Sequence, residues 1–107
     1  MASLDATLRA LADPNRRRIL NLIRQPRPVG EIAKSVEMSQ QAVSFHLRVL
    51  HGAGLVSEHR DRQRHLFVVR TDGLAAARDF LADFWPARLQ SLKVAAEAAT
   101  RTKKRRA

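Results

Sequence analysis

The hydrophobic residues in the first half of the chain recur at the three- and four-residue spacing of amphipathic helices. This spacing predicts four helices, over residues 3–12, 15–25, 29–36 and 40–52. Asp13 is the expected N-cap of the second helix and Pro14 its first residue, and the stretch 26–29, PRPV, is expected to end it. Only residues 37–39 separate the third helix from the fourth, with Ser39 as the expected N-cap. Two helices joined by so short a turn are typical of a helix-turn-helix motif.

The pattern changes after the fourth helix, where short apolar and β-branched segments flank a polar centre. Residues 55–56 and 66–69 predict a two-stranded hairpin with its tip near residues 61–63. Thr71 and Asp72 are then expected to cap a last helix over residues 73–99, which Pro86 should kink or restart. The order of elements predicts a mostly α fold with a small β component (α+β). It is a winged helix-turn-helix of about five helices and a hairpin wing.

The length of the chain indicates the number of domains, and its net charge indicates the kind of binding partner. The 107 residues suggest one domain, and 20 Lys and Arg against 10 Asp and Glu give a formal charge of +10. Residues 101–107 carry five of the cations and are expected to be a basic, disordered tail after a domain spanning residues 1–100. Without that tail the charge is still +5, from 15 cations minus 10 acids. Such a balance indicates a polyanionic partner, since cations that bind phosphates release counterions.

Several chemistries find no support in the sequence. The chain has no cysteine, which excludes disulfides and thiolate metal sites and fits a reducing compartment. No signal peptide and no apolar run of about 18 residues is visible, so we expect no membrane contact and a cytoplasmic protein. No Ser-His-Asp set, paired-acid spacing or Gly-rich phosphate loop is visible, so we expect no catalytic residues, no cofactor and no enzyme activity.

The fourth helix divides into two faces when its residues are placed at 100° intervals. The inward arc is a core stripe of Ala42, Val43, His46, Leu47, Val49 and Leu50. The outward arc has no acid and consists of Gln40, Gln41, Ser44, Phe45, Arg48 and His51. In a DNA major groove, Gln can pair with adenine, Arg with guanine, Ser with base or phosphate, and an apolar ring with the thymine methyl. The alternative is that the outward arc is an ordinary helix face exposed to solvent, without a DNA partner.

The hairpin tip repeats this cationic character. Arg60, Arg62, Arg64 and His65 gather there, opposed by Asp61. A cationic hairpin beside a recognition helix can lie on adjacent phosphates or in the minor groove. The alternative is a charged edge that resists strand pairing. The two features together, in this order along the chain, favour DNA.

Three segments carry a resemblance to the ArsR (arsenic-repressor) type of bacterial winged-helix regulators. They are LRALADPNRRRILNLI (8–23), VGEIAKSVEMSQQAVSFHLRVLHGAGLVSEHRDRQRH (29–65) and FLADFWPARLQSLK (80–93). The resemblance implies a homodimer that binds a double-stranded DNA operator and represses transcription. It places Ser39, Gln40, Gln41, Ser44 and Arg48 in the recognition helix and Arg60, Arg62, Gln63 and Arg64 in the wing. Phe45 joins these candidate DNA contacts from the helix pattern.

The chain departs from the family pattern at several positions. The third helix reads VGEIA where metal sensors often carry a Cys-containing box, and the last helix has Asp79, Asp83 and Glu97 but no His. We therefore expect no metal site and no metal sensing. The wing tip has Arg62 and Gln63 where Gly followed by Arg is common. Glu37 also stands where Gly is common, at a cost of ~1 kcal/mol if its backbone is left-handed.

A stripe of apolar residues at helical spacing exceeds what one small core should leave exposed. The resemblance pairs the first and last helices across a dimer, so we expect a two-fold interface of Leu4, Leu8, Leu74, Ala77, Leu81, Trp85, Leu89 and Leu92. The alternative is that the stripe packs within its own subunit. An organic effector could bind between the dimer helices near Phe80, Phe84 and Trp85, although such aromatics are more often plain core.

The histidines and the choice of function leave alternatives open. His46 is expected to be a half-buried, hydrogen-bonded group. His59 and His65 could face each other across the hairpin, a weak zinc possibility because two ligands do not close a structural site.

The predicted function is a sequence-specific dimeric repressor acting at an inverted-repeat operator. The alternative is a winged helix for protein–protein contact or a nucleoid-coating protein, which would lack a large ratio of specific to non-specific affinity.

Overall fold

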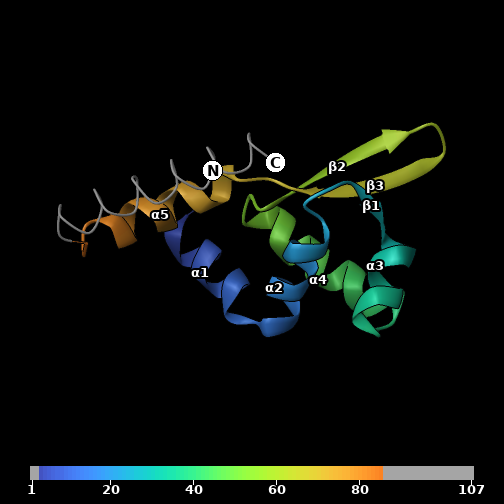
Figure 1. Cartoon of the computed structure of the whole chain (residues 1–107), viewed down its shortest axis with the longest axis horizontal. Helices are drawn as coiled ribbons and strands as arrows, with labels where there is room; N and C mark the ends of the chain where they lie inside the picture. Colours follow the sequence, from blue (N-terminus) through green and yellow to red (C-terminus); the bar gives the residue numbers. More distant parts are fainter. Residues whose placement is uncertain (1–2, 86–107) are drawn as a thin grey trace, which may run out of the picture. The chain divides into compact units, whose positions relative to one another are not determined.

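The computed structural model describes residues 3–85, and the chain divides into two compact units, residues 1–77 and 78–107. Four helices and a small sheet make up the first unit (Figure 1). The elements in chain order are α1 (Leu4–Ala12), α2 (Pro14–Leu22), β1 (Arg27–Pro28), α3 (Val29–Val36), α4 (Gln40–Gly52), β2 (Val56–Asp61), β3 (Arg64–Val69), the 3-10 helix η1 (Asp72–Leu74) and α5 (Ala75–Ala82). The predicted winged helix-turn-helix fold is confirmed. No helix among these residues is long and apolar enough to span a bilayer.

Local caps start the helices where the sequence predicts. The Asp13 carboxylate accepts hydrogen bonds from the backbone N–H groups of Asn15 (2.7 Å) and Arg16 (3.3 Å), with Pro14 as the first helical residue. Ser39 Oγ accepts from the Ala42 N–H at 3.1 Å and so caps α4. These bonds satisfy donors that the first turn of a helix cannot pair internally.

The sheet corrects two predictions about the stretch after α2. The helix ends at Leu22 rather than at residue 25, and residues 27–28 form a third strand where only a helix stop was expected. The strand order is β1-β3-β2, all antiparallel, with Arg27 opposite Phe67. The Ile23 carbonyl accepts from the Val69 N–H at 2.8 Å, which ties the end of α2 to the base of β3. This pairing is long-range, so local periodicity does not reveal it.

The core lies between the helices and one face of the sheet. Helices α1 to α4 all contribute buried apolar side chains to this core. The large side chains that are fully buried are Ile19, Ile23, Ile32, Val43, Leu50, Leu55 and Val56. Thr7 is the buried polar residue of this core, and its hydroxyl donates to the Gly73 carbonyl oxygen at 2.8 Å. Burial of this apolar surface, at about 25 cal/mol per Å², is the main force that holds the α3–α4 pair in place.

The start of the last helix also differs from the prediction. Thr71 makes no side-chain cap, and a 3-10 turn precedes the α-helix. The Asp72 carboxylate instead accepts two bonds from Arg70, at 3.0 and 2.8 Å. Helix α5 ends at Ala82, ahead of the predicted break, and the Trp85 N–H donates to the Ala82 carbonyl oxygen. Pro86, the rest of the predicted helix and the basic tail lie outside the described residues.

Glu37 has the left-handed backbone that the sequence singled out, with φ 57° and ψ 46°. It is the C-cap of α3, and its N–H and that of Met38 both donate to the Ala33 carbonyl oxygen. We expect Glu37→Gly to raise the free energy of unfolding by about 1 kcal/mol, because Gly removes the Cβ strain at some cost in chain entropy. Urea denaturation measures the change.

Lys34→Gly is the matched control for Glu37→Gly. Lys34 is exposed within the right-handed part of α3, where Gly should lower stability by about 1 kcal/mol. Equal effects of the two glycine substitutions would contradict the assignment of strain to residue 37.

Candidate nucleic-acid interface

Helix α4 presents the two faces that its sequence predicts. Val43, Leu47 and Leu50 are buried, whereas Gln40, Gln41, Phe45, Arg48 and His51 are exposed and Ser44 is half-buried. Phe45 keeps 52% of its surface exposed, unusual for so large an apolar ring. No described acidic group pairs with Arg48. The outward face thus offers hydrogen-bonding side chains, one unpaired cation and one exposed ring.

The turn before α4 brings the start of this helix to the surface. Ser39 is exposed, and its hydroxyl oxygen already accepts the capping bond from Ala42. Its O–H remains a donor for a phosphate oxygen, next to the positive end of the helix dipole. The amide nitrogen of Gln40 lies near the start of α3, 3.6 Å from the point where a Cβ would stand on Gly30. Gln41, by contrast, is exposed one residue further along α4.

An arginine that sequence reasoning missed links α4 to the first two helices. Arg16 donates from Nε to the Ala10 carbonyl oxygen (2.7 Å) and from Nη2 to that of Arg9 (3.0 Å). Its Nη1 lies 3.4 Å from His46 Nδ1 and 3.8 Å from the Asp13 carboxylate. His46 is therefore the half-buried, partnered group that was predicted. Within the run of three arginines, helical spacing alone does not show which one turns inward.

Asp13 has a pKa below its ordinary value. Desolvation raises the pKa of Asp13, but the hydrogen bonds from the N–H groups of Asn15 and Arg16 and the electrostatic effects of the Arg16 and His46 side chains lower it by a larger amount. Since the folded-state pKa lies below the unfolded one, the carboxylate stabilises the fold at neutral pH. This contribution is lost as the pH falls through the folded-state pKa.

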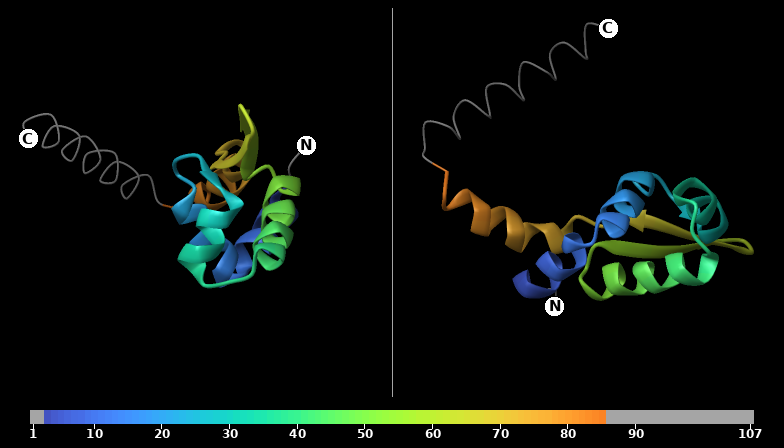
Figure 2. Two further views of the ribbon diagram at one scale, coloured as in Figure 1. Left: turned by 90° about the vertical axis from the view of Figure 1, so that its right-hand side faces the viewer. Right: turned by 90° about the horizontal axis from the view of Figure 1, so that it is seen from below.

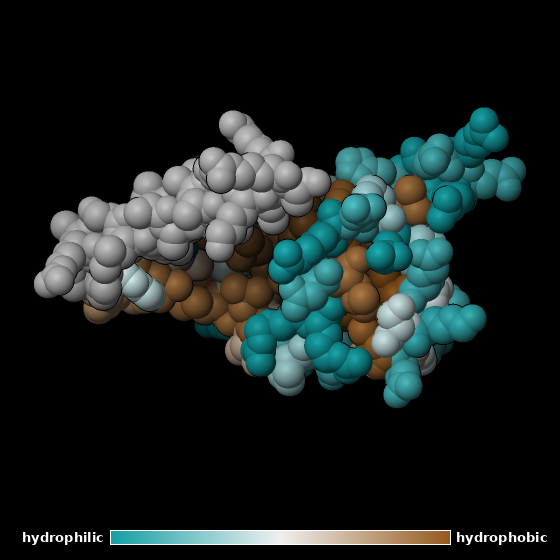
Figure 3. All heavy atoms as spheres, in the orientation of Figure 1, coloured by the Kyte–Doolittle hydropathy of each residue, from teal (hydrophilic) through white to brown (hydrophobic). Residues whose placement is uncertain are grey.

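The wing carries its cations around a two-residue turn. Strand register pairs Asp61 with Arg64 and Arg60 with His65. Because successive side chains of a strand alternate between faces, Arg60 and Arg64 lie on opposite faces of the hairpin. Arg62 stands in the turn itself with φ 61°, which explains why Gly would suit this position. The hairpin projects beyond the helices, and hydrophilic side chains cover its tip (Figures 2 and 3).

The register overturns the zinc possibility in the hairpin. His59 pairs with Leu66 and His65 pairs with Arg60, so the two imidazoles lie on opposite faces. His65 Nε2 instead lies 3.0 Å from a carboxylate oxygen of Glu58. Residues 3–85 contain no group of three or more potential ligands that could hold a metal ion.

The residues expected at a dimer interface differ in exposure. Leu8, Leu81 and Trp85 are 45%, 48% and 47% exposed. Ala77 is buried within its own chain, and Leu4 and Leu74 are half-buried. Leu89 and Leu92 lie outside the described residues. The exposed members are large apolar side chains that keep almost half of their surface exposed in the described part of the chain.

A helix-turn-helix with an acid-free outward face, followed by a hairpin with a cationic tip, defines a DNA-binding protein of the winged helix-turn-helix class. The bacterial regulatory protein arsR family matches residues 13–58. HTH-type transcriptional regulator Rv2034 of Mycobacterium tuberculosis is 42% identical over 84 residues, which cover 78% of each chain. The chain belongs to the ArsR family of bacterial regulatory proteins.

Two further relatives agree with this assignment. Transcriptional repressor SdpR of Bacillus subtilis is 29% identical over 76% of this chain and 91% of its own. A homodimeric winged helix-turn-helix DNA-binding domain from Mycobacterium bovis, described as a possible ArsR-family transcriptional regulator, superposes with a TM-score of 0.63. The two sequences are 30% identical, and the superposition covers 75% of this chain and 78% of the Mycobacterium bovis chain. This chain is thus a transcriptional regulator and, as predicted, comes from a family that is not one of enzymes.

Proposed function

We propose that the protein is a homodimeric repressor that recognises an inverted-repeat operator by direct readout from α4. The observation that carries this proposal is the acid-free exposed face of α4, where Arg48 has no described acidic partner. A solvated helix face normally mixes both charge signs, whereas phosphates select against acids.

The two cationic elements have different tasks in this proposal. Gln40, Gln41, Ser44, Phe45 and Arg48 face base edges in the major groove, and Ser39 donates to a phosphate. Gln40, close to the start of α3, contributes at the edge of this set. The wing residues Arg60, Arg62, Gln63 and Arg64 contact the backbone or the minor groove beside it. Helix contacts therefore specify sequence, and wing contacts supply affinity.

Dimerisation supplies the symmetry that an inverted repeat requires. The apolar side chains Leu8, Leu81 and Trp85 are each almost half exposed, which favours burial against a second copy. The homodimeric state of the Mycobacterium bovis relative and the repressor named SdpR support the proposal. A protein that binds DNA in this way would reside on the bacterial nucleoid.

Footprinting of the gene's own upstream DNA, combined with sedimentation of the complex, tests the proposal. We expect a dimer that protects two half-sites whose centres lie about one helical turn, ~34–36 Å, apart or a multiple of it. Insertion of five base pairs between the half-sites turns one of them to the opposite side of the duplex and should abolish protection.

A monomer at micromolar concentration, with and without DNA, would contradict the dimer. Uniform coating of the fragment, unaffected by the insertion, would favour the nucleoid-coating alternative.

A further inference from the structure

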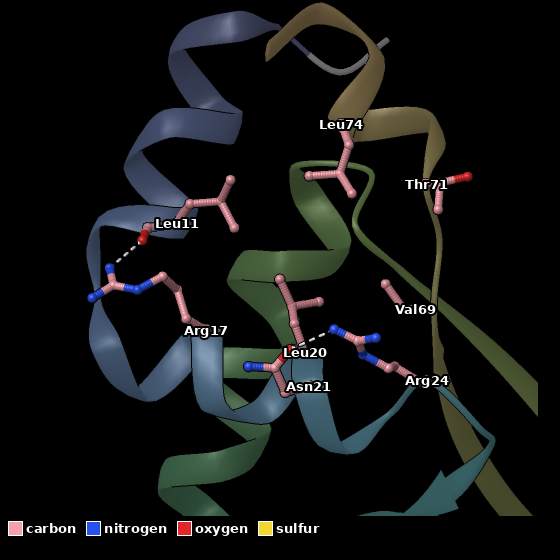
Figure 4. Close-up of a pocket in the computed structure, with 8 residues that line it drawn as sticks. All are labelled: Leu11, Arg17, Leu20, Asn21, Arg24, Val69, Thr71 and Leu74. Carbon is pink, nitrogen blue, oxygen red and sulfur yellow. Dashed lines mark hydrogen bonds between the residues drawn. The ribbon is translucent and has the colours of Figure 1, made fainter. Parts of the chain in front are cut away.

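A cavity of about 440 Å³ opens between α1, α2, β3 and η1, all within the first unit (Figure 4). Its apolar lining comes from one residue of each of these elements: Leu11, Leu20, Val69 and Leu74. The leucine side chains converge on the space in Figure 4. Ligand pockets typically have volumes of roughly 300–1,000 Å³, so this cavity can hold the apolar body of a small molecule.

Two arginines, Arg17 and Arg24, are among the residues that line this apolar space. Arg17 Nη1 donates to the Leu11 carbonyl oxygen at 2.6 Å, and Arg24 Nη2 donates to Asn21 Oδ1 at 3.1 Å. An arginine has five N–H donors, and none of the described carboxylates pairs with either residue. Thr71 and Asn21 add polar groups to the border of the cavity.

We propose that this cavity binds an organic acid with an apolar body, whose carboxylate lies against Arg17 or Arg24 and whose chain or ring contacts the four aliphatic residues. Charge complementarity selects the acid, since guanidinium donors match the planar geometry of a carboxylate. An apolar molecule without a charge would leave these cations without an acidic partner. Its lining residues do not include Phe80, Phe84 or Trp85, near which the sequence predicts an effector.

The position of the cavity connects its occupant to elements of the DNA-binding domain. Val69 is the last residue of the wing strand β3, and its N–H donates to the Ile23 carbonyl oxygen at the end of α2. Leu74 ends η1, directly before α5. An occupant would therefore contact the base of the wing and the approach to the last helix at once.

Methyl NMR of the full-length, DNA-free protein tests the proposal with sodium decanoate as the probe and decanol as its uncharged match. We expect saturable decanoate shifts at the methyl groups of Leu11, Leu20, Val69 and Leu74, and weaker binding of decanol by about fivefold or more. Arg17→Gln and Arg24→Gln should each weaken decanoate binding, by about fivefold for the residue that pairs with the carboxylate. The control is Arg18→Gln. Arg18 is an exposed arginine of α2 that follows Arg17 in the sequence and does not line this cavity, so the decanoate affinity should stay unchanged.

Several outcomes would overturn the proposal. These are no saturable shift at millimolar decanoate, equal affinity for decanoate and decanol, or shifts confined to the methyl groups of Leu81, which follows Phe80 in the sequence. Shifts of the four aliphatic residues with protein concentration alone would show that a second copy of the chain covers the cavity. Because DNA is absent from the experiment, its failure would leave the proposed operator recognition untouched.

Discussion

Arg48→Ala should weaken binding to the operator by about 1–3 kcal/mol and relax the preference at one base pair in each half-site. Arg48 is exposed on α4, carries no described ion pair and stands one turn beyond Ser44 on the outward face. A guanidinium in this place can bond two acceptors of guanine at once, and alanine leaves these acceptors without a donor. Competition titrations against a set of single-base operator variants measure both the loss and the change in preference.

Arg62→Ala and Arg64→Ala are the matched controls, because each also removes one exposed cation. Both lie at the turn of the hairpin, so they should weaken binding evenly across sequences. Each should also lower the salt slope by about one phosphate contact, ~0.9 in log–log units. If Arg48→Ala lowers affinity for operator and random DNA by the same factor, Arg48 contacts only phosphate. The same result for Gln41 and Ser44 would remove direct readout altogether.

Gly73→Ala should lower the free energy of unfolding by about 3 kcal/mol. A Cβ on Gly73 would clash with the Ala53 carbonyl oxygen and would stand 2.7 Å from that of Gly54. Backbone atoms cannot rotate away as a flexible side chain can. The Gly73 N–H also donates to Gly54, and its carbonyl accepts from buried Thr7, so a shift of η1 breaks both bonds. Thermal and urea denaturation, analysed together, measure the loss.

Gly52→Ala provides the control for this substitution. A Cβ on Gly52 meets nothing within 4 Å at the last residue of α4, so alanine should stabilise the protein by up to about 1 kcal/mol. A loss of less than about 0.5 kcal/mol for Gly73→Ala would show that η1 can move away at little cost. The contact with the turn after α4 would then not determine where the last helix begins.

Features that depend on neighbouring residues can be predicted from the amino-acid sequence. The caps at Asp13 and Ser39 act on N–H groups two or three residues away, so their chemistry is local and readable. The buried and exposed arcs of α4 follow from 3.6 residues per turn, which any sequence with that period must obey. The left-handed backbone of Glu37 also follows from a single position whose residue type departs from the expected Gly.

Features that join distant segments of the chain depend on its three-dimensional packing. The strand β1 exists because Arg27 pairs with Phe67, and no local pattern marks two residues as a strand. Strand register separates His59 from His65, since a shift of one residue moves a side chain to the other face. The inward turn of Arg16, the close approach of Gly73 to Ala53 and the cavity between Leu11 and Leu74 likewise depend on how separate elements pack. Local propensity carries no information about these distances, because the contacts form only when the core assembles.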